Sequence, residues 1–233
     1  MHVTLIPVII LIAGLALARI VLFVKTDTGY KEPIIMLWMA AGLGAIALNA
    51  SQILEFLIIP QNIIFALKDG SATLMQNIFA SSSIAVIEEL AKFLPLMLLI
   101  KNRKFFNEMT DGVIYFAIAG QTFGLLEDIA YTMSSGTEAG LLRLIFTPFF
   151  HLATTGIIGY YLARHKIFKK PLWTVALSVI AMIVVHFVYD FGLFSGQSTL
   201  TFVSLSITII LAIAVIIYLL VAHNTDKKLG LAD

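Results

Sequence analysis

Two adjacent glutamates, Glu88 and Glu89, lie in the middle of an apolar stretch of the chain. The stretch is rich in Ile, Val, Leu and Ala on both sides of the pair, as a membrane-spanning helix would be. A carboxylate at the centre of a bilayer costs about 2.5–3.5 kcal/mol on insertion scales, so residues retained at this cost mark functional sites by default. We therefore interpret the pair as part of a catalytic centre built inside a membrane.

The composition is that of a polytopic membrane protein. Of the 233 residues, 60% are hydrophobic and only 12% are charged, and the mean hydropathy is +0.98. A soluble domain has about 45–50% apolar and about 25% charged residues. The net charge of +1 leaves no basic patch, which argues against a nucleic-acid partner. The absence of cysteine excludes disulfides, thiolate metal sites and a cysteine nucleophile.

Seven apolar runs are long enough, at about 20 residues each, to span a bilayer. We predict an all-α, polytopic helical bundle that forms a single integral-membrane domain over residues 1–233. Its catalytic core is expected over residues 72–195, and residues 60–70 are expected to be a loop or a short interfacial helix. The predicted spans are residues 3–24, 33–59, 72–100, 109–133, 139–163, 171–193 and 199–222.

The distribution of Lys and Arg predicts the orientation of the chain in the membrane. Basic residues gather in alternate links, namely those after the first, third and fifth predicted spans, and in the C-terminal tail. The other links carry no Lys or Arg, apart from Lys68 beside Asp69. Because cytoplasmic loops carry an excess of Lys and Arg, we expect a multi-pass protein of the cell membrane with its N-terminus outside and its C-terminus cytoplasmic.

Ionisable residues on four predicted spans are expected at a similar depth. At a helical rise of 1.5 Å per residue, Glu89, His151, His186 and Glu127 lie roughly 18 to 29 Å above the cytoplasmic border. Side chains of this kind are tolerated at bilayer depth only when they face a shared polar or water-filled interior. We therefore expect them to meet in the outer half of the bilayer. Glu55 in the second span is interpreted as structural or as lying near the outer surface.

Helical spacing assigns a different neighbour to each glutamate of the pair. Glu88 and Lys92 are four residues apart and share a helical face, so we expect Lys92 to offset the charge of Glu88. Glu89 points about 100° away. His186 and Asp190 are also four residues apart, so Asp190 can orient or charge the imidazole. We assign Glu88 as the base that activates water, with Glu89 supporting it or binding metal.

Two catalytic schemes are open at this point, and the first uses zinc. Zinc catalysis needs three His, Glu or Asp ligands and an open position for water. Glu127, His151 and His186 would supply the three ligands. Glu88 or Glu89 would then act as the general base.

The second scheme needs no metal. A glutamate acts as the base, its proton affinity tuned by burial and by the neighbouring carboxylate. His186 and Asp190 then stabilise the oxyanion. Both schemes hydrolyse an acyl bond, above all a peptide bond. The chain has no His-Glu-x-x-His zinc motif, no Gly-x-Ser-Gly serine site and no paired-aspartate motif of the Gly-x-Gly-Asp type.

Four short elements of the sequence resemble the PrsW family of intramembrane proteases. This family is related to the CAAX prenyl proteases and bacteriocin-processing proteins, and more remotely to the APH subunit of γ-secretase. The resemblance covers about residues 80–195. One departure is Asp128, where the family usually has Asn, because it adds a potential charge to the site. The matching elements are Glu88-Glu89-x-x-Lys92, Phe123-x-x-x-Glu127-Asp128, His151 and His186-x-x-x-Asp190.

The resemblance implies a role for each element. The two glutamates of the first motif activate water, and Glu127 stands where the prenyl-protease relatives have a His. His151 corresponds to the histidine considered essential in PrsW. His186 with Asp190 corresponds to the oxyanion element of the relatives. The supporting residues of these motifs are Lys92, Phe123 and Asp128.

We therefore expect an intramembrane endopeptidase that hydrolyses a membrane-anchored protein near the outer half of the bilayer. Members of the family that the chain resembles are described both as metalloproteases and as glutamate-type proteases. The resemblance therefore implies either a zinc cofactor or none. PrsW itself cuts an anti-sigma factor at its extracytoplasmic side. Two alternatives are a non-catalytic scaffold or binding subunit of the same fold, and a proton-coupled transporter, since buried Glu and His chains relay protons. The chain lacks the paired repeats that many transporters have.

Overall fold

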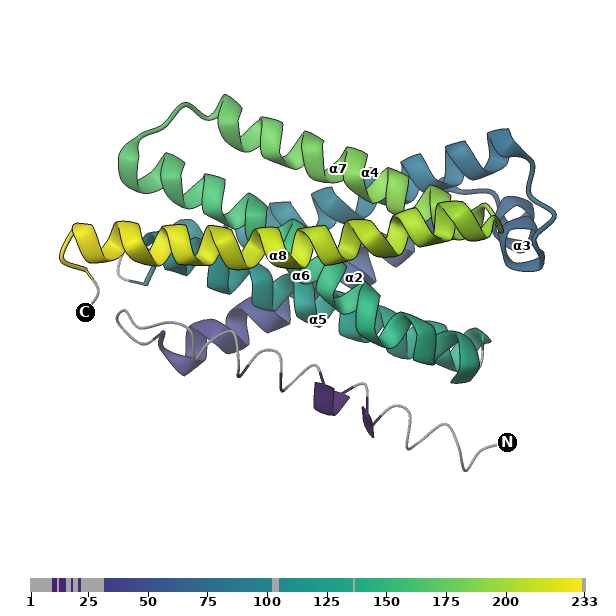
Figure 1. Ribbon diagram of the computed structural model, residues 1–233, viewed down its shortest axis with the longest axis horizontal. Helices are drawn as coiled ribbons and strands as arrows, with labels where there is room; N and C mark the ends of the chain where they lie inside the picture. Colours follow the sequence, from purple (N-terminus) through teal and green to yellow (C-terminus); the bar gives the residue numbers. More distant parts are fainter. Residues whose placement is uncertain are drawn as a thin grey trace.

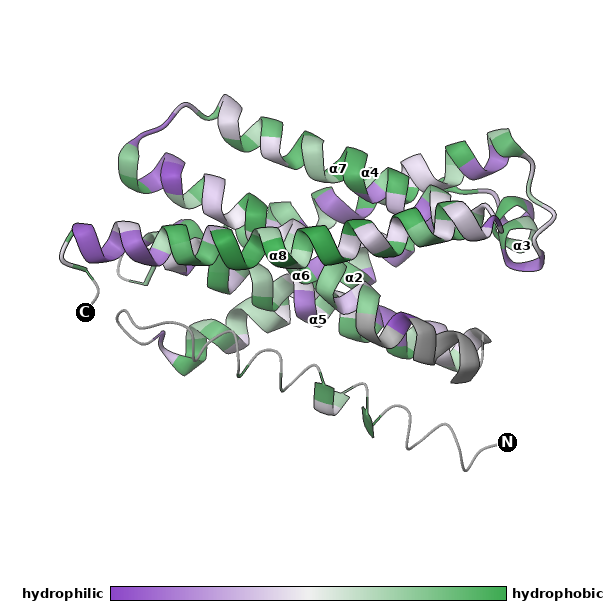
Figure 2. Ribbon diagram, viewed as in Figure 1, coloured by the Kyte–Doolittle hydropathy of each residue, from purple (hydrophilic) through white to green (hydrophobic). Residues whose placement is uncertain are grey.

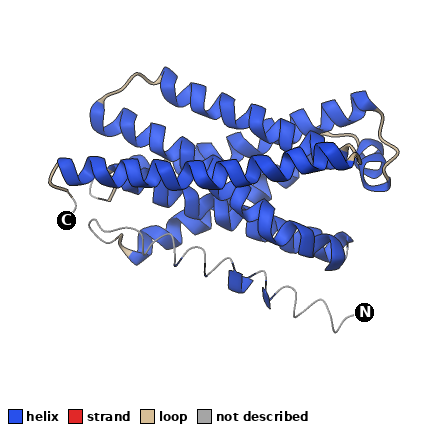
Figure 3. Ribbon diagram, in the orientation of Figure 1, coloured by secondary structure: helices blue, strands red, loops and turns tan. Residues whose placement is uncertain are grey.

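The computed structural model describes residues 32–101, 105–135 and 137–231, together with isolated positions between residues 10 and 21. Every regular element in these ranges is a helix (Figures 1 and 3). The first predicted span, residues 3–24, lies largely outside them. The helices are α2 (Ile34–Ile58), α3 (Gln61–Asp69), α4 (Leu74–Leu96), the short 3-10 helix η1 (Leu99–Lys101), α5 (Met109–Ser135), α6 (Thr137–Phe168), α7 (Trp173–Phe194) and α8 (Ser198–Lys228).

The all-α fold is confirmed, and each predicted span from residue 33 onward corresponds to one long helix. The short helix α3 occupies the segment 60–70, for which the sequence allows either a loop or a short helix. Four of the described helices, α2, α5, α7 and α8, are long and apolar enough to cross a membrane. The predicted number of seven spans is not confirmed. Helix α4 has the length of a span but carries buried polar residues, which lower its hydropathy.

Local sequence signals explain where the helices begin and end. Pro33 directly precedes α2 and Pro60 directly precedes α3. Proline suits the start of a helix, because its φ is fixed and the backbone N–H that it lacks would have no partner there. Gly70 ends α3 with a φ of 76°, in the left-handed region that glycine adopts without strain. Thr73 and Gln76 form a capping box that starts α4.

Helix α5 is the central helix of the bundle. In its most apolar stretch 67% of the residues are buried, against 28–39% in α2, α7 and α8. It makes its most extensive contact with α6, and α8 lies across both in Figure 1. On the outer helices, apolar side chains are exposed and several polar ones are buried, which is the reverse of the distribution in a soluble protein. On α8, Ile209, Ile213 and Leu220 are exposed while Ser204 and Thr208 are buried, which fits an apolar solvent around the bundle.

Small residues bring α5 and α6 into backbone contact. A Cβ atom added to Gly112 or to Gly159 would collide with the carbonyl oxygen of the other residue. Two turns further along, Gly120 packs against the backbone of His151, and a Cβ on Gly124 would lie 2.9 Å from the His151 ring. This close approach, typical of membrane helices with small residues at the interface, positions His151 against α5.

A carboxylate near the end of α8 caps the start of α5. The backbone N–H groups of Met109 and Thr110 donate to the two oxygens of Asp226, at 2.8 and 2.9 Å. The Asp226 side chain is buried. Because the first N–H groups of a helix have no partner within the helix, an acidic side chain there is stabilising. The cap fastens α8 to the central helix.

We predict that Gly159→Ala destabilises the protein while Gly42→Ala does not. The added methyl at Gly159 meets the Gly112 backbone and the Phe116 side chain, and such overpacking costs about 1–3 kcal/mol. A methyl at Gly42 meets nothing within 4 Å and improves helix propensity. Thermal unfolding of the purified proteins in detergent measures both. Equal midpoints for the two variants would contradict the close α5–α6 contact.

Candidate active site inside the bundle

Four helices bring their ionisable side chains to one place in the interior. The structure assembles every residue named from the sequence, and only Glu127 in this set is more than slightly exposed, with 23% of its side chain accessible. The site consists of Glu88, Glu89 and Lys92 from α4, Phe123, Glu127 and Asp128 from α5, His151 from α6, and His186 and Asp190 from α7.

His151 makes one hydrogen bond through each ring nitrogen. Its Nε2 lies 2.8 Å from Glu127 Oε2, and its Nδ1 lies 2.9 Å from Lys92 Nζ. An ammonium group can only donate, so Nδ1 accepts and the ring proton on Nε2 is donated to Glu127. Nδ1 also faces Glu88, at 4.0 Å from its Oε2.

His186 has a similar arrangement with a different acid. Its Nδ1 lies 2.8 Å from Glu89 Oε1. Its Nε2 faces two further carboxylates, 3.7 Å from Glu88 Oε2 and 3.3 Å from Asp190 Oδ2. Each histidine therefore uses one nitrogen to contact an orienting carboxylate and turns the other toward Glu88.

The geometry around Glu88 fits a metal ion. Its Oε2 is buried and makes no hydrogen bond to any described residue. One ligand atom each from Glu88, His151 and His186 lie within 4.8 Å of one another. A tetrahedral zinc site with bonds of 2.0–2.1 Å places its ligand atoms roughly 3.3 Å apart. Reaching that spacing takes small inward shifts of the side chains and the release of His151 Nδ1 from Lys92. A carboxylate on the second nitrogen of each histidine is the usual arrangement around metal-binding imidazoles.

The expected pairing of Lys92 with Glu88 is not formed. Lys92 Nζ lies 2.7 Å from Glu89 Oε1, three residues away instead of four. Glu89 also binds His186, so α7 fixes the rotamer of this glutamate and the ammonium joins it. Glu88 is left to point between the two imidazoles.

The set of ligand atoms that converges also differs from the set predicted from the sequence. Glu127 was expected beside His151 and His186 in the metal shell. Instead it accepts the Nε2 proton of His151 and forms an ion pair with Arg143. Glu88 takes its place in the converging group. The contacts of Glu127 with an imidazole and a guanidinium are those of a group that orients a neighbouring side chain.

Arg143 is a site residue that sequence reasoning missed. Its guanidinium forms an ion pair with Glu127, lies 3.2 Å from Asp128 Oδ1 through Nε, and stacks over the ring of Tyr131 at 4.4 Å. It therefore offsets the negative charge of Asp128. The signal in the sequence was weak: Arg143 lies about two turns before His151 in α6, but its acidic partners lie on α5.

Glu55 of α2 also faces the site. Its Oε1 is buried without a hydrogen-bond partner among the described residues. It interacts electrostatically with Glu127, Asp190, His186 and Lys92. Helix α2, which packs against α5 and α4, therefore adds a carboxylate to the surroundings of the site.

Aromatic rings form the walls of the site. Phe150 lies edge-on to both imidazoles, with ring centroids 5.5 Å from His151 and 5.0 Å from His186. It stacks on Tyr189 at 4.1 Å. Phe123 covers the other side of His151 at 5.0 Å. These contacts fix the ring orientations and keep the surroundings of the carboxylates low in water, which strengthens their electrostatic interactions.

Buried acids and imidazoles inside an apolar helical bundle are expected of an intramembrane hydrolase and also of a proton relay. Comparisons with known proteins identify the class as an intramembrane protease. A family model described as PrsW family intramembrane metalloprotease matches residues 32–221. The chain belongs to the PrsW family of intramembrane metalloproteases.

Curated relatives carry the name Protease PrsW. The protein from Bacillus subtilis strain 168 is 26% identical over 186 residues, which cover 78% of this chain and 81% of the relative. The protein from Oceanobacillus iheyensis is 30% identical over 123 residues, which cover 52% of this chain and 56% of the relative. That from Geobacillus kaustophilus is 28% identical, over 49% of this chain and 52% of the relative. The chain thus matches only about half the length of two of these relatives. No solved structure matches significantly.

We predict that Arg143→Gln lowers proteolytic activity roughly 10-fold, the lower end of the effect of removing an outer partner of a metal ligand, because Arg143 contacts Glu127 and not His151 itself. Loss of the guanidinium releases Glu127, which orients His151. Arg143→Lys should retain more activity, because an ammonium keeps the charge although it cannot contact two carboxylates through a planar fork. Cleavage rates in liposomes measure the effect. Activity in Arg143→Gln equal to that of wild type would contradict this role.

Proposed function

We propose that this protein hydrolyses a peptide bond in a membrane-anchored protein, using a zinc ion held by Glu88, His151 and His186. One observation carries the proposal. The ligand atoms of these three side chains converge from three helices, while the second nitrogen of each histidine contacts a separate carboxylate. The family to which the chain belongs is described as metalloproteases, which supports peptide hydrolysis with a bound metal ion.

The protein's own groups hold and orient the ligands. Glu127 accepts the Nε2 proton of His151, and Glu89 accepts the Nδ1 proton of His186. Such outer carboxylates fix the tautomer and raise the basicity of each imidazole. When bound, zinc supplies a water whose pKa is about 7 and polarises the scissile carbonyl.

A separate carboxylate, that of Asp190, would take the proton of the attacking water. Asp190 Oδ2 lies 3.3 Å from His186 Nε2 and makes no hydrogen bond by the usual geometric criteria. It therefore borders the same space as Glu88. In this scheme Glu88 is a ligand and Asp190 is the general base. Lys92 provides a positive charge beside His151, where it stabilises negative charge that develops on the substrate carbonyl oxygen.

The surroundings of the site favour a substrate held in the same membrane. The exposed side chains of α2, α7 and α8 are predominantly apolar, so the bilayer covers these faces and a substrate in the bilayer can approach them directly. The relatives' name, Protease PrsW, supports a protein substrate. A single-span anti-sigma factor, the kind of substrate cut by PrsW, is the natural first test.

A metal-free scheme is the second candidate, and the position of Lys92 favours it. Its ammonium lies 2.9 Å from His151 Nδ1, the nitrogen that would bind the metal. In this scheme Glu88 accepts the proton of the water, as assigned from the sequence, and His186 with Asp190 stabilises the oxyanion. The two schemes differ in what the Glu88 carboxylate does.

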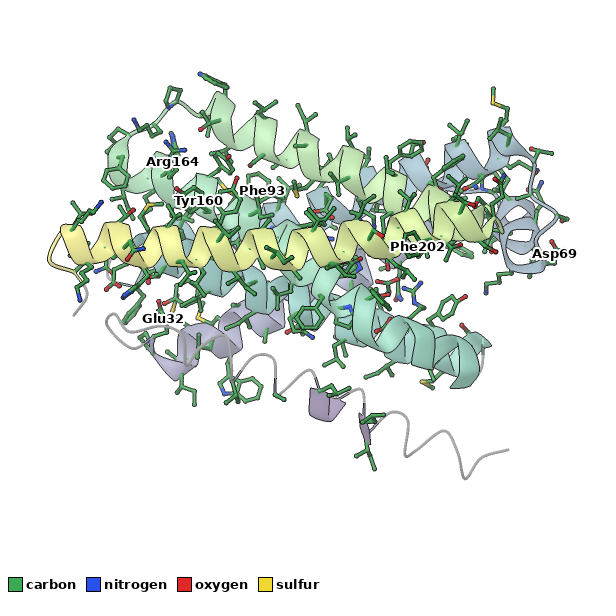
Figure 4. The ribbon with its side chains drawn as sticks, in the orientation of Figure 1. Glu32, Asp69, Phe93, Tyr160, Arg164 and Phe202 are labelled. Atoms are coloured by element: carbon green, nitrogen blue, oxygen red, sulfur yellow. The ribbon has the colours of Figure 1, made fainter. Side chains whose placement is uncertain are left out.

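Metal content separates the two schemes. We predict that the active wild-type protein binds about one zinc ion per chain, that Glu88→Gln and His151→Ala lose it, and that Glu127→Gln keeps it with roughly 10- to 100-fold weaker affinity. Elemental analysis of purified protein, with and without a chelator, measures this. Asp69→Asn serves as the control, because Asp69 is an exposed acid at the end of α3 and is not one of the residues of the site. Figure 4 shows it at one end of the bundle. Full activity in protein free of zinc would select the metal-free scheme.

Asp190→Asn tests the proposed base. We expect this variant to bind zinc normally and to lose roughly 10²- to 10⁴-fold in turnover, the usual contribution of a general base. Cleavage of a reconstituted single-span anti-sigma factor, followed by gel mobility, measures the rate. Retained cleavage in both Glu88→Gln and His151→Ala would overturn the protease proposal itself.

A further inference from the structure

A groove between α6, α7 and α8, together with an adjoining basic cavity, lies away from the candidate active site. We propose that the two form a binding site for one anionic phospholipid, with an acyl chain in the groove and the phosphate in the basic cavity. This site does not depend on the proposed function, since it contains none of the catalytic groups.

The groove is apolar and has a volume of about 380 Å³. Aromatic and aliphatic side chains from all three helices line it, and Thr174 and Ser178 are its two aliphatic hydroxyl residues. The Ser178 hydroxyl donates to the carbonyl oxygen of Val175 in the same helix, and the Thr174 hydroxyl donates to that of Pro171 just before the helix. Both hydroxyls therefore have hydrogen-bond acceptors within the protein. The main lining residues are Ile157, Tyr161, Trp173, Leu177, Met182 and Tyr218.

The length of the groove favours an acyl chain over a transmembrane helix. Its lining runs along α7 from Trp173 to Met182, which is about 14 Å at 1.5 Å per residue. The hydrocarbon core of a bilayer is about 30 Å thick. The groove therefore covers one leaflet, whereas a membrane-spanning substrate would need a groove through both. Exposed Trp173 marks the interfacial end, where tryptophan is enriched.

The second cavity, of about 370 Å³, is basic. Arg164 and Lys170 line it, together with Tyr160, Phe168, Met109 and Thr225. No acidic side chain is among these lining residues. The Lys170 segment is held in place, because His165 Nδ1 lies 2.6 Å from the Lys170 carbonyl oxygen and the Lys170 N–H donates back to the Arg164 carbonyl. Two cations without a lining acid complement an anion.

A cluster of tyrosines joins the two cavities. Tyr161 and Tyr218, which line the groove, have hydroxyls 3.1 Å apart, and the Tyr218 ring lies 4.7 Å from that of Tyr160 in the basic cavity. The Arg164 guanidinium lies 5.8 and 5.9 Å from the rings of Tyr160 and Tyr161. The positive charge thus lies at the mouth of the groove.

The location agrees with a lipid headgroup. Figure 4 shows Arg164 and Tyr160 toward the same end of the bundle, and Figure 2 shows hydrophilic residues at this end, in the α6–α7 loop and at the end of α8. Basic pockets between membrane helices at a charged membrane face bind phosphate-bearing headgroups. A zwitterionic lipid has no net charge to complement two cations, so the site favours an anionic lipid.

Lipid binding is tested by native mass spectrometry of the full chain titrated with phosphatidylglycerol or phosphatidylcholine of equal chain length. We expect one phosphatidylglycerol to bind preferentially. The double variant Arg164→Gln, Lys170→Gln should bind it roughly thirtyfold more weakly, given the usual contribution of each cation near a membrane surface. Ala181→Phe, which adds bulk at an exposed position in the groove, should reduce binding of both lipids.

Two matched variants control for charge and for bulk. Lys68→Gln removes a cation on α3, away from the groove, and Ile210→Phe enlarges an exposed apolar side chain on α8 outside its lining. Both should bind phosphatidylglycerol as wild type does. Equal binding of the two lipids, or an unchanged affinity in the Arg164/Lys170 variant, would overturn the proposal. Inorganic phosphate that displaces the lipid at equal concentration would show a phosphate site without a lipid and would overturn it as well.

Discussion

The buried contact of Lys92 with Glu89 and His151 is the interaction on which the rest of the site depends. The ammonium lies 2.7 Å from Glu89 and 2.9 Å from His151, and its side chain is 1% exposed. It therefore joins α4 to α6, and Glu89 extends the link to His186 on α7. Removing one member of a buried pair leaves a charge without compensation, which typically costs 3–5 kcal/mol. The three helices are thus held together by groups of the candidate site itself.

The network continues outward through acids that each have a partner. Arg143 contacts Glu127 and Asp128, so the negative charge of Asp128 is balanced within the same cluster. Glu88 differs from these acids, since no Lys or Arg of the described residues forms an ion pair with it and its Oε2 has no hydrogen-bond partner there. A buried oxygen of this kind is costly unless it gains a partner during function. A metal ion or a water molecule would supply one.

The sequence alone predicted the helices and the meeting of the ionisable groups, because depth along a helix follows from residue number. It could not predict which glutamate pairs with Lys92. Spacings of three and four residues both place side chains on one helix face, and the choice depends on His186, which comes from a helix about 100 residues later. Arg143 was missed for the same reason, because its partners lie on another helix. The ion pair of Glu127 with Arg143 also depends on how α5 packs against α6, and for that reason the sequence did not exclude Glu127 from the expected metal ligands.

The Asp226 cap has a consequence for biosynthesis. The N–H groups of Met109 and Thr110 receive their partner from the end of α8, which is 116 residues or more further along the chain. During translation α5 enters the membrane long before Asp226 has been made. The first turn of the central helix therefore gains this cap only after α8 has been made, whereas its contacts with α6 can form earlier. The last helix of the chain thus completes the packing of α5 at the end of assembly.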